Sequence, residues 1–215
     1  MIRRFYQNNK EVIVFLVLMV LFRSSIADIN RVPTGSMKPT IVEGDRIVVN
    51  KLAYDIQFPL TNTKLYQLGN PARGDIVVFE SAVLDDRLVK RVIGLPGDVV
   101  AMQNNRLTIN GAPSTYELIN EAVSDKHMDL VERLGDFSHP VRVDRFWSPN
   151  ASFNSIRVPE GHYLVLGDNR DNSADSRAIG FIPRQEIIGR SRSVFMSLDP
   201  EDYYLPRTER FFVPL

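Results

Sequence analysis

Short hydrophobic runs separated by turn-forming residues make up most of the chain after Pro33. The runs are rich in Val and Ile and are bounded by Gly, Pro, Asn or Asp, which is the pattern of β-strands. Asn104-Asn105 and Asn110-Gly111 stand on either side of one short run and are typical hairpin turns. The pattern predicts a mostly β fold of antiparallel sheets, arranged as a sandwich or a barrel. The predicted strands are residues 46–51, 75–80, 88–94, 98–102, 106–109, 162–167 and 187–198.

The stretch from residue 116 to residue 155 differs from these runs. It is more polar, and it contains His127 and His139, two of the three histidines of the chain. We expect a helix over residues 116–134, followed by loops that contain proline. We interpret residues 116–155 as an insertion or a second, smaller lobe.

The first 31 residues differ in composition from the rest of the chain. Basic residues at the start precede an unbroken apolar run from residue 12 to residue 22, and Arg23 follows that run. As a helix, these eleven apolar residues would cover about 16 Å, which is less than the roughly 30 Å of a bilayer's hydrocarbon core. The segment is therefore directed to a membrane but cannot cross it on the apolar run alone.

Two interpretations of this segment remain open from the pattern. A cleavable signal peptide fits the charged start, the apolar length and the small residues that follow. A retained anchor fits if the 23 residues from 5 to 27 span the membrane while Lys10 and Arg23 extend their charged ends to the interfaces. A buried core helix is disfavoured because no polar face interrupts the run. Positive charge before the run favours a cytoplasmic N-terminus and export of residues 32–215.

Composition excludes several kinds of function. Lys and Arg together number 26, as do Asp and Glu, so the formal net charge is zero and the basic footprint of a dedicated nucleic-acid-binding protein is missing. Cysteine is absent, which excludes disulfides, thiolate metal sites and a cysteine nucleophile. Three histidines leave little material for a zinc site. We expect no nucleic-acid partner, no metal and no organic cofactor.

A serine nucleophile and a lysine base are the chemistry that the remaining residues can supply. Ser36 follows a glycine in a segment bounded by two prolines, a rigid turn that would hold its hydroxyl at the surface, although most such segments are plain turns. Lys90 lies in a strand pattern on the same face as Leu88 and Val92, so apolar neighbours would surround its amine. Burial lowers the pKa of a lysine and makes it a usable base. The competing interpretations are an edge-strand lysine that points to water, and Lys51 as the buried lysine.

A dense polar loop follows the predicted strand at 162–167. Residues 167–177 read Gly-Asp-Asn-Arg-Asp-Asn-Ser-Ala-Asp-Ser-Arg. The ligand spacing of an EF-hand calcium loop is missing, and two arginines stand among the acidic residues. We therefore expect internal ion pairs and hydrogen bonds from side chains to the backbone, which would stiffen the loop so that it presents one hydroxyl.

Together these motifs resemble type I signal peptidase, a membrane-anchored serine protease with a Ser/Lys dyad. The resemblance extends from the apolar segment to about Leu198 and rests on five blocks that follow the order of that family. The blocks are residues 33–40, 44–54, 73–79, 90–98 and 167–177.

The resemblance implies roles for residues of the dyad and the polar loop. Ser36 would be the nucleophile and Lys90 the general base. The Ser173 hydroxyl would orient the Lys90 amine, and an ion pair between Asp175 and Arg177 would stiffen the loop around it.

Two further residues near the dyad receive roles from the same resemblance. Arg91 would be structural and would lie on the opposite face of the strand from Lys90. Thr34 stands where the family usually has a serine. Its hydroxyl would then act as an oxyanion donor beside the Ser36 backbone amide.

The resemblance implies that the substrates are exported preproteins, bound as extended strands with small residues at positions −1 and −3. Shallow apolar pockets would admit these small residues. The residues expected to line the pockets are Val32, Met37, Leu88 and Val89.

The resemblance also favours the retained anchor, and with it a signal-peptidase-like β fold carrying one N-terminal transmembrane helix. Residues 1–31 would form a cytoplasmic stub and a single-pass anchor in the bacterial inner membrane. Residues 32–215 would form an extracytoplasmic, periplasmic catalytic domain at the lipid bilayer. Residues 26–32 are more polar than is usual in that family.

Two rival functions compete with this interpretation. One is a catalytically silent, membrane-tethered binding protein on the same scaffold, against which the intact Ser36, Lys90 and Ser173 argue. The other is a self-cleaving Ser/Lys repressor-like protein. That protein would need a helix-turn-helix domain in the place that the apolar segment occupies.

Overall fold

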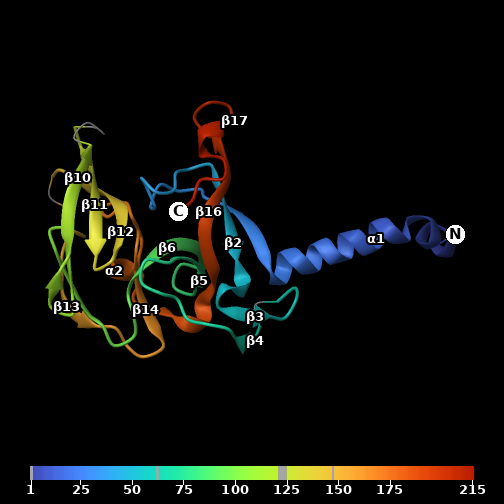
Figure 1. The fold of residues 1–215 in the computed structure, drawn as a ribbon, viewed down its shortest axis with the longest axis horizontal. Helices are drawn as coiled ribbons and strands as arrows, with labels where there is room; N and C mark the ends of the chain where they lie inside the picture. Colours follow the sequence, from blue (N-terminus) through green and yellow to red (C-terminus); the bar gives the residue numbers. More distant parts are fainter. Residues whose placement is uncertain (1, 62, 121–124, 147) are drawn as a thin grey trace.

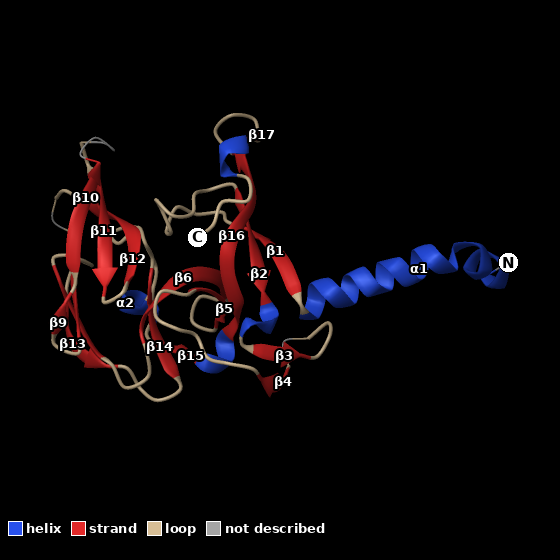
Figure 2. Ribbon diagram, viewed as in Figure 1, coloured by secondary structure: helices blue, strands red, loops and turns tan. Residues whose placement is uncertain are grey.

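The computed structural model describes residues 2–61, 63–120, 125–146 and 148–215. Helix α1 (Ile2–Ser25) extends away from a body made of β-sheets (Figure 1). Most of the large apolar side chains between Val12 and Phe22 are exposed on it. Among the described residues, no helix has both the length and the apolar character that a membrane crossing requires. Outside α1, the described chain is almost entirely strand, turn and loop (Figure 2).

In the described part of the chain, the largest sheet contains eight strands. They are β1 (Ala27–Arg31), β2 (Asp45–Asn50), β5 (Ile76–Ser81), β6 (Asp86–Gly94), β14 (His162–Leu166), β15 (Ile182–Pro183), β16 (Ile187–Asp199) and β17 (Leu205–Pro206). The order is β1-β2-β16-β5-β6-β14-β15, with β17 beside β16, and each of these pairs is antiparallel. The long strand β16 runs through the middle of the body (Figure 1).

Three smaller sheets complete the described fold. One pairs β3 (Asp55–Gln57) with β4 (Lys64–Gln67); a second has the order β13-β7-β8-β9, and a third the order β10-β11-β12. The strands of the second are β7 (Val99–Gln103), β8 (Arg106–Ile109), β9 (Ala112–Pro113) and β13 (Phe153–Arg157). Those of the third are β10 (Thr115–Asn120), β11 (His127–Leu134) and β12 (Phe137–Asp144). The short helix α2 (Ser176–Ile179) and 3₁₀ turns at Lys51–Ala53, Arg184–Glu186 and Thr208–Arg210 lie in connections.

The strands predicted from the Val- and Ile-rich runs are all present, close to their expected bounds. Both expected hairpin turns are present as well. Asn104 and Asn105 have φ values of 49° and 60°, and Asn110 and Gly111 have φ values of 53° and 80°. Positive φ at both central residues is the geometry of the type I′ turn, which matches the twist of the flanking strands. The local chemistry of Asn and Gly therefore specifies this part of the fold.

The prediction of a helix over residues 116–134 is wrong. This stretch contributes β10 and β11 instead, and residues 121–124 between them lie outside the described residues. In β11, the carboxylates of Asp129 and Glu132 are buried because arginines from elsewhere in the chain bind them. Polar side chains that would lie on the exposed face of a helix thus point into the protein. The backbone of β11 forms its hydrogen bonds with β10 and β12 instead of within a helix.

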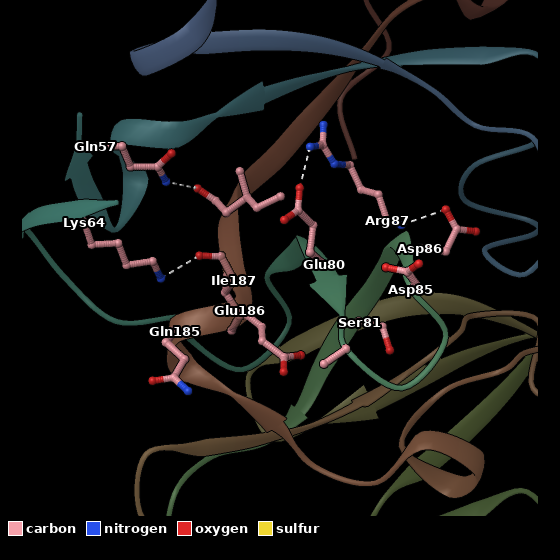
Figure 3. A pocket seen from close by; sticks show the side chains of 12 residues that line it. Gln57, Lys64, Glu80, Ser81, Asp85, Asp86, Arg87, Gln185, Glu186 and Ile187 are labelled. Carbon is pink, nitrogen blue, oxygen red and sulfur yellow. Dashed lines mark hydrogen bonds and ion pairs between the residues drawn. The ribbon is translucent and has the colours of Figure 1, made fainter. Parts of the chain in front are cut away.

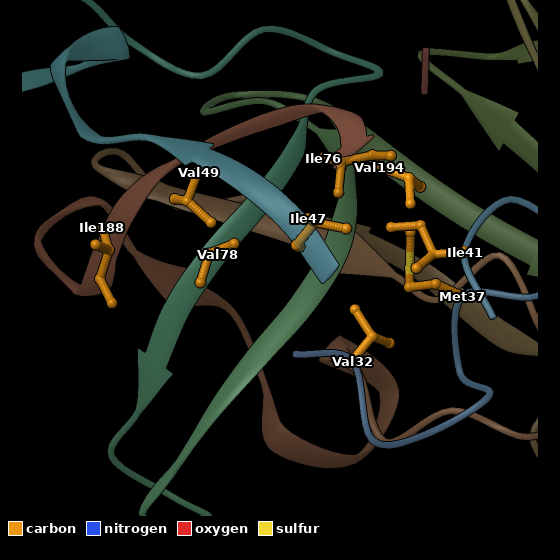
Figure 4. Packing of buried hydrophobic residues seen from close by; sticks show 9 residues of the cluster. All are labelled: Val32, Met37, Ile41, Ile47, Val49, Ile76, Val78, Ile188 and Val194. Atoms are coloured by element: carbon orange, nitrogen blue, oxygen red, sulfur yellow. The ribbon is translucent and has the colours of Figure 1, made fainter. Parts of the chain in front are cut away.

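A buried apolar cluster joins the main sheet to the segment that carries Ser36. Ile47 on β2, Val78 on β5 and Val194 on β16 are all fully buried in it. Figure 4 shows Met37 and Ile41, from the segment before β2, packed against these strand residues. Val32, which precedes the serine, belongs to the same cluster, so apolar contacts on either side of Ser36 hold this segment against the sheet.

Removing side-chain volume from this cluster should destabilise the whole body. Ile47→Ala should lower the free energy of unfolding by about 2–5 kcal/mol, because the buried side chain leaves a cavity between packed strands. Ile56→Ala is the matched control, since Ile56 is 41% exposed, and should change that free energy by less than about 0.5 kcal/mol. Urea denaturation of both variants measures the difference. Equal denaturation midpoints would contradict the assignment of Ile47 to the core.

Candidate active site

Ser36 lies in a tight turn that precedes the main sheet. The Lys38 amide donates to the Gly35 carbonyl at 3.1 Å, and the Ile41 amide donates to the Met37 carbonyl at 2.9 Å. Met37 and Ile41 are buried in the core, whereas Ser36 is partly exposed. The turn therefore presents the Ser36 hydroxyl at the surface of a rigid body.

Lys90 meets Ser36 from the middle of β6. It pairs with Val77 of β5, and only 3% of its surface is exposed. Its Nζ lies 2.8 Å from Ser36 Oγ and 3.0 Å from the carbonyl oxygen of Val89. The amine is thus within hydrogen-bonding distance of a candidate nucleophile, and the interpretation of Lys90 as an edge lysine that points to water is wrong.

Lys51, the other lysine considered from the sequence, has a different partner. Its Nζ donates to the carbonyl oxygen of Ser24, near the end of α1, at 2.9 Å. Lys51 therefore joins the helix to the body, whereas Lys90 is the lysine that reaches Ser36.

Burial gives Lys90 the electrostatic property that a base needs. Loss of hydration disfavours the charged amine and lowers the pKa of Lys90 to about 8, although Asp175 and Asp168 act to raise it. A lysine with a pKa near 8 is partly neutral in mildly alkaline solution, and the neutral amine can accept a proton.

The polar loop that follows β14 holds the backbone of the serine turn. The Asn169 amide donates to the Ser36 carbonyl at 3.0 Å, and the Asn169 side chain donates to the Gly35 carbonyl at 3.0 Å. At Gly167, a Cβ would come within 2.5 Å of the Ser36 carbonyl oxygen and 2.2 Å of Ser173 Oγ. Only glycine lets the loop approach the serine this closely.

Ion pairs stiffen this loop. Arg91 donates to both carboxylate oxygens of Asp168, at 2.8 and 2.7 Å, and Thr40 donates to the same carboxylate. Burial acts to raise the pKa of Asp168, but the Arg91 guanidinium outweighs it and holds the pKa below its ordinary value. Arg177 forms the expected pair with Asp175 at 2.6 Å. Both carboxylates beside the site are therefore bound by arginine.

Thr34 and Ser173 lie close to Ser36 without contacting Lys90 through a hydrogen bond. Thr34 is exposed and lines the same cleft as Ser36. Ser173 Oγ is buried beside Gly167 and has no hydrogen-bond partner within the part of the chain that the structure describes. Ser173 thus lies near Ser36, but its hydroxyl does not form the expected hydrogen bond to the Lys90 amine.

A cleft of about 370 Å³ opens beside the two residues. It is bounded by β1 on one side and by the first half of β6 on the other. Within the described ranges, β1 pairs with β2 alone, and β14 pairs with β6 from Arg91 onward. The far edge of β1 and the first half of β6 are therefore unpaired beside the cleft. The residues that line it include Thr34, Ser36 and Lys90 together with Val32, Met37, Leu88 and Val89.

A larger cavity of about 810 Å³ lies at the β5–β6 hairpin (Figure 3). Lys64 and Arg87, its cationic residues, are paired with Asp55 and Glu80 respectively. Its buried Ser81 accepts a hydrogen bond from the Leu84 amide and has no lysine or histidine bonded to it among the described residues. Among the described residues, the larger cavity therefore contains no serine bonded to a lysine or histidine, whereas the smaller cleft contains the Ser36–Lys90 pair.

The contacts that hold this site from outside the motifs do not follow from the sequence pattern. Asp168 binds Arg91, and Asn169 binds the Ser36 backbone. Glu132, to which the sequence pattern gives no role, binds Arg170 inside the body. The density of polar residues in the loop was the available signal, but it did not reveal their partners.

Comparisons with family models, with related sequences and with solved structures all find signal peptidases. The family described as Signal peptidase, peptidase S26, matches residues 6–196. Signal peptidase I of Pseudomonas aeruginosa is 36% identical over 210 residues, which cover 91% of this chain and 74% of that protein. Signal peptidase I P of Bacillus subtilis subsp. natto is 34% identical over 191 residues, which cover 88% of each chain. A crystal structure of a signal peptidase I from Enterococcus faecalis has 31% identity and a TM-score of 0.38, over 57% of this chain and 97% of that one.

The family match spans most of the chain, and the sequence relatives exceed 30% identity over most of it. These sequence matches and the Ser36–Lys90 pair in the cleft lead to the same conclusion. The chain belongs to the signal peptidase family, peptidase S26, and is a peptidase that removes signal peptides from preproteins.

Proposed function

We propose that the chain cleaves preproteins with Ser36 as the nucleophile and Lys90 as the general base. The observation that carries this proposal is the distance of 2.8 Å between Lys90 Nζ and Ser36 Oγ. An adjacent base within hydrogen-bonding distance is what activates a serine hydroxyl.

The reaction then follows from where the proton goes. In its neutral form, Lys90 takes the proton of the Ser36 hydroxyl as Oγ attacks the carbonyl carbon of the scissile bond. The tetrahedral intermediate collapses to an acyl ester on Ser36, and the Lys90 ammonium returns the proton to the departing amine. Lys90 then takes a proton from water, which attacks the ester carbonyl, and returns that proton to Ser36 Oγ as the ester bond breaks. The signal peptide leaves with a free carboxyl group, and Ser36 and Lys90 return to their starting states.

Thr34 and Ser173 support this reaction in the proposed mechanism. The Thr34 hydroxyl and the Ser36 backbone amide would donate to the oxyanion that forms on the carbonyl oxygen. The Ser173 hydroxyl would orient the amine of Lys90 once the lysine has lost its proton. The absence of another partner for Ser173 Oγ among the described residues leaves it available for this role.

The substrate would bind as an extended strand between the free edges of β1 and β6. Its backbone would pair with both edges, as in other cases of strand addition to an exposed sheet edge. Side chains at positions −1 and −3 lie on the same face of a strand and would point together toward the wall of the cleft. The shallow apolar surface formed by Val32, Met37, Leu88 and Val89 would admit small residues there.

The membrane location is also part of the proposal. Helix α1 would be retained as a single-pass anchor in the bacterial inner membrane, with a cytoplasmic N-terminus. The exposed apolar side chains between Val12 and Phe22 support contact with lipid. Residues 32–215 would be the periplasmic catalytic domain, and residues 116–155 a smaller lobe of it.

Replacing the base by a residue that keeps its charge should abolish cleavage. Lys90→Arg should be as inactive as Ser36→Ala, because a guanidinium stays protonated in proteins and cannot accept the serine proton. Lys38→Arg is the control, since the Lys38 side chain forms a half-exposed pair with Glu43 at 2.7 Å that arginine can keep, and it should retain normal activity. Cleavage of a model preprotein measures all three. Activity of Lys90→Arg within tenfold of the wild type would refute the dyad.

The cleavage rate should rise with pH through the pKa of Lys90. Burial lowers that pKa to about 8, so the amine is protonated and inactive as a base at pH 6 and mostly neutral at pH 10. The value of kcat/KM should therefore increase about tenfold per pH unit below 8 and level off above it. A series of initial rates across this range measures the profile. A flat profile between pH 6 and pH 9 would mean that another group acts as the base.

Removing the Thr34 hydroxyl should slow the chemical step. Thr34→Val keeps the shape of the side chain and should lower kcat about 10²–10³-fold with little change in KM, because an oxyanion donor acts mainly in the transition state. Thr34→Ser should remain active because it restores a hydroxyl. If Thr34 only braces the Pro33 turn, Thr34→Val will retain a near-normal kcat or lose activity only through a lower melting temperature.

A further inference from the structure

An ion pair inside the body connects the sheet β10-β11-β12 to the polar loop of residues 167–177, which contacts Ser36. The Arg170 side chain donates to both carboxylate oxygens of Glu132 on β11, one of them at 2.8 Å. Glu132 is 0% exposed and Arg170 is 1% exposed. Burial acts to raise the pKa of Glu132, but Arg170 outweighs it and the pKa lies below its ordinary value, so the pair is ionised.

Neighbouring side chains complete the surroundings of Glu132. The Tyr116 hydroxyl on β10 donates to Glu132 and accepts a hydrogen bond from the Leu107 amide of β8 at 2.9 Å. His139 Nε2 on β12 lies 3.4 Å from Glu132 and 3.6 Å from Asp168. Burial lowers the pKa of His139 to about 4, so the ring is neutral near pH 7 and leaves Arg170 as the cation that balances Glu132.

A short chain of backbone contacts leads from Arg170 to the nucleophile. The Arg170 amide donates to the Arg142 carbonyl at 2.9 Å, and the Arg142 amide donates to the Asp168 carbonyl at 2.8 Å. Between these two contacts, the Asn169 amide donates to the Ser36 carbonyl at 3.0 Å. The segment 168–170 is therefore fixed to β11 and β12 on one side and holds the serine turn on the other.

We propose that Glu132 is a positioning residue for the reaction, which holds the Ser36 backbone in place through Arg170 and Asn169. This inference rests on the proposed function of Ser36 and adds a role for the sheet β10-β11-β12. In this view the buried side of the sheet, through the Glu132–Arg170 pair, sets where the nucleophile stands relative to Lys90, whereas its exposed side takes no part.

The expected effect is on kcat. Ser36 Oγ must approach the scissile carbonyl along a narrow range of directions, and a displacement of about 1 Å in a reacting group costs roughly 10²-fold in rate. Loosening segment 168–170 would let the serine turn shift while the cleft that binds the substrate stays in place. The substrate affinity should therefore change little.

A double variant tests this without leaving a buried charge unpaired. Glu132→Gln combined with Arg170→Met removes both charges and the two-pronged contact while keeping similar side-chain volumes. We expect kcat per folded molecule to fall about 10–100-fold, KM to stay within about twofold, and the pH midpoint near 8 to persist because Lys90 is untouched. Cleavage kinetics at a temperature well below the melting point of each full-length protein supply these values.

The same sheet offers a matched control pair. Glu117 on β10 and Arg133 on β11 form a contact of the same type, at 3.2 and 3.0 Å, on the exposed side of the sheet. Glu117→Gln combined with Arg133→Met should leave kcat unchanged. A folded Glu132→Gln/Arg170→Met enzyme whose kcat lies within threefold of this control would overturn the proposal.

If the double variant does not fold, a milder variant tests the positioning role of Glu132. Tyr116→Phe removes one hydrogen bond to Glu132 without removing a charge. It should keep a melting temperature close to that of the wild type and lower kcat several-fold, and an unchanged kcat would overturn the proposal. Ser36→Ala separates the two hypotheses. If that variant remains active, the dyad itself is wrong, whereas an inactive Ser36→Ala beside fully active Glu132 variants rejects only the positioning role.

Discussion

The contact between a buried lysine amine and a serine hydroxyl is the constraint on which the rest of the structure depends. Lys90 can act as a base only if it gives up its proton near working pH, and burial is what lowers its pKa to about 8. Two buried carboxylates nearby, Asp168 and Asp175, favour the charged amine. Arg91 and Arg177 bind these carboxylates and offset their charge. The ion pairs around the site thereby limit how strongly the carboxylates hold Lys90 in its protonated form.

The interior near the site is consequently more charged than the apolar core beneath the main sheet. Buried ion pairs of this kind contribute little net stability, because the loss of hydration offsets the attraction, yet removing one partner is costly. Their effect is that an arrangement of the segments in which every buried charge is paired has a much lower free energy than one in which a charge is left unpaired. Arg91 of β6 binds Asp168, and Glu132 of β11 binds Arg170, so these two pairs hold both ends of the loop segment 168–170, whose Asn169 contacts Ser36.

The pairing of strand β6 both buries Lys90 and leaves an open strand edge through which a peptide can reach it. From Arg91 onward, β6 is covered by β14, whereas residues 86–90 have β5 on one side only. Lys90 is the last residue of β6 before the part that pairs with β14. Its side chain is buried, whereas the backbone edge of residues 86–90 remains open to an extended peptide. A shift of the strand pairing by one residue would move the side chain to the other face of the sheet.

The sequence alone determined the strand segments, the hairpin turns and the two residues of the dyad as candidates, because these depend on local chemistry and on short motifs. Tertiary structure decided how they meet. No local pattern could show that Lys90 lies 2.8 Å from Ser36, since 54 residues separate them. The strands within 116–134 were missed for the same reason: Glu132 is buried only because Arg170, 38 residues further along the chain, neutralises it. Propensities act over a few neighbouring residues, whereas the pairing of buried charges depends on segments that come together only when the chain folds.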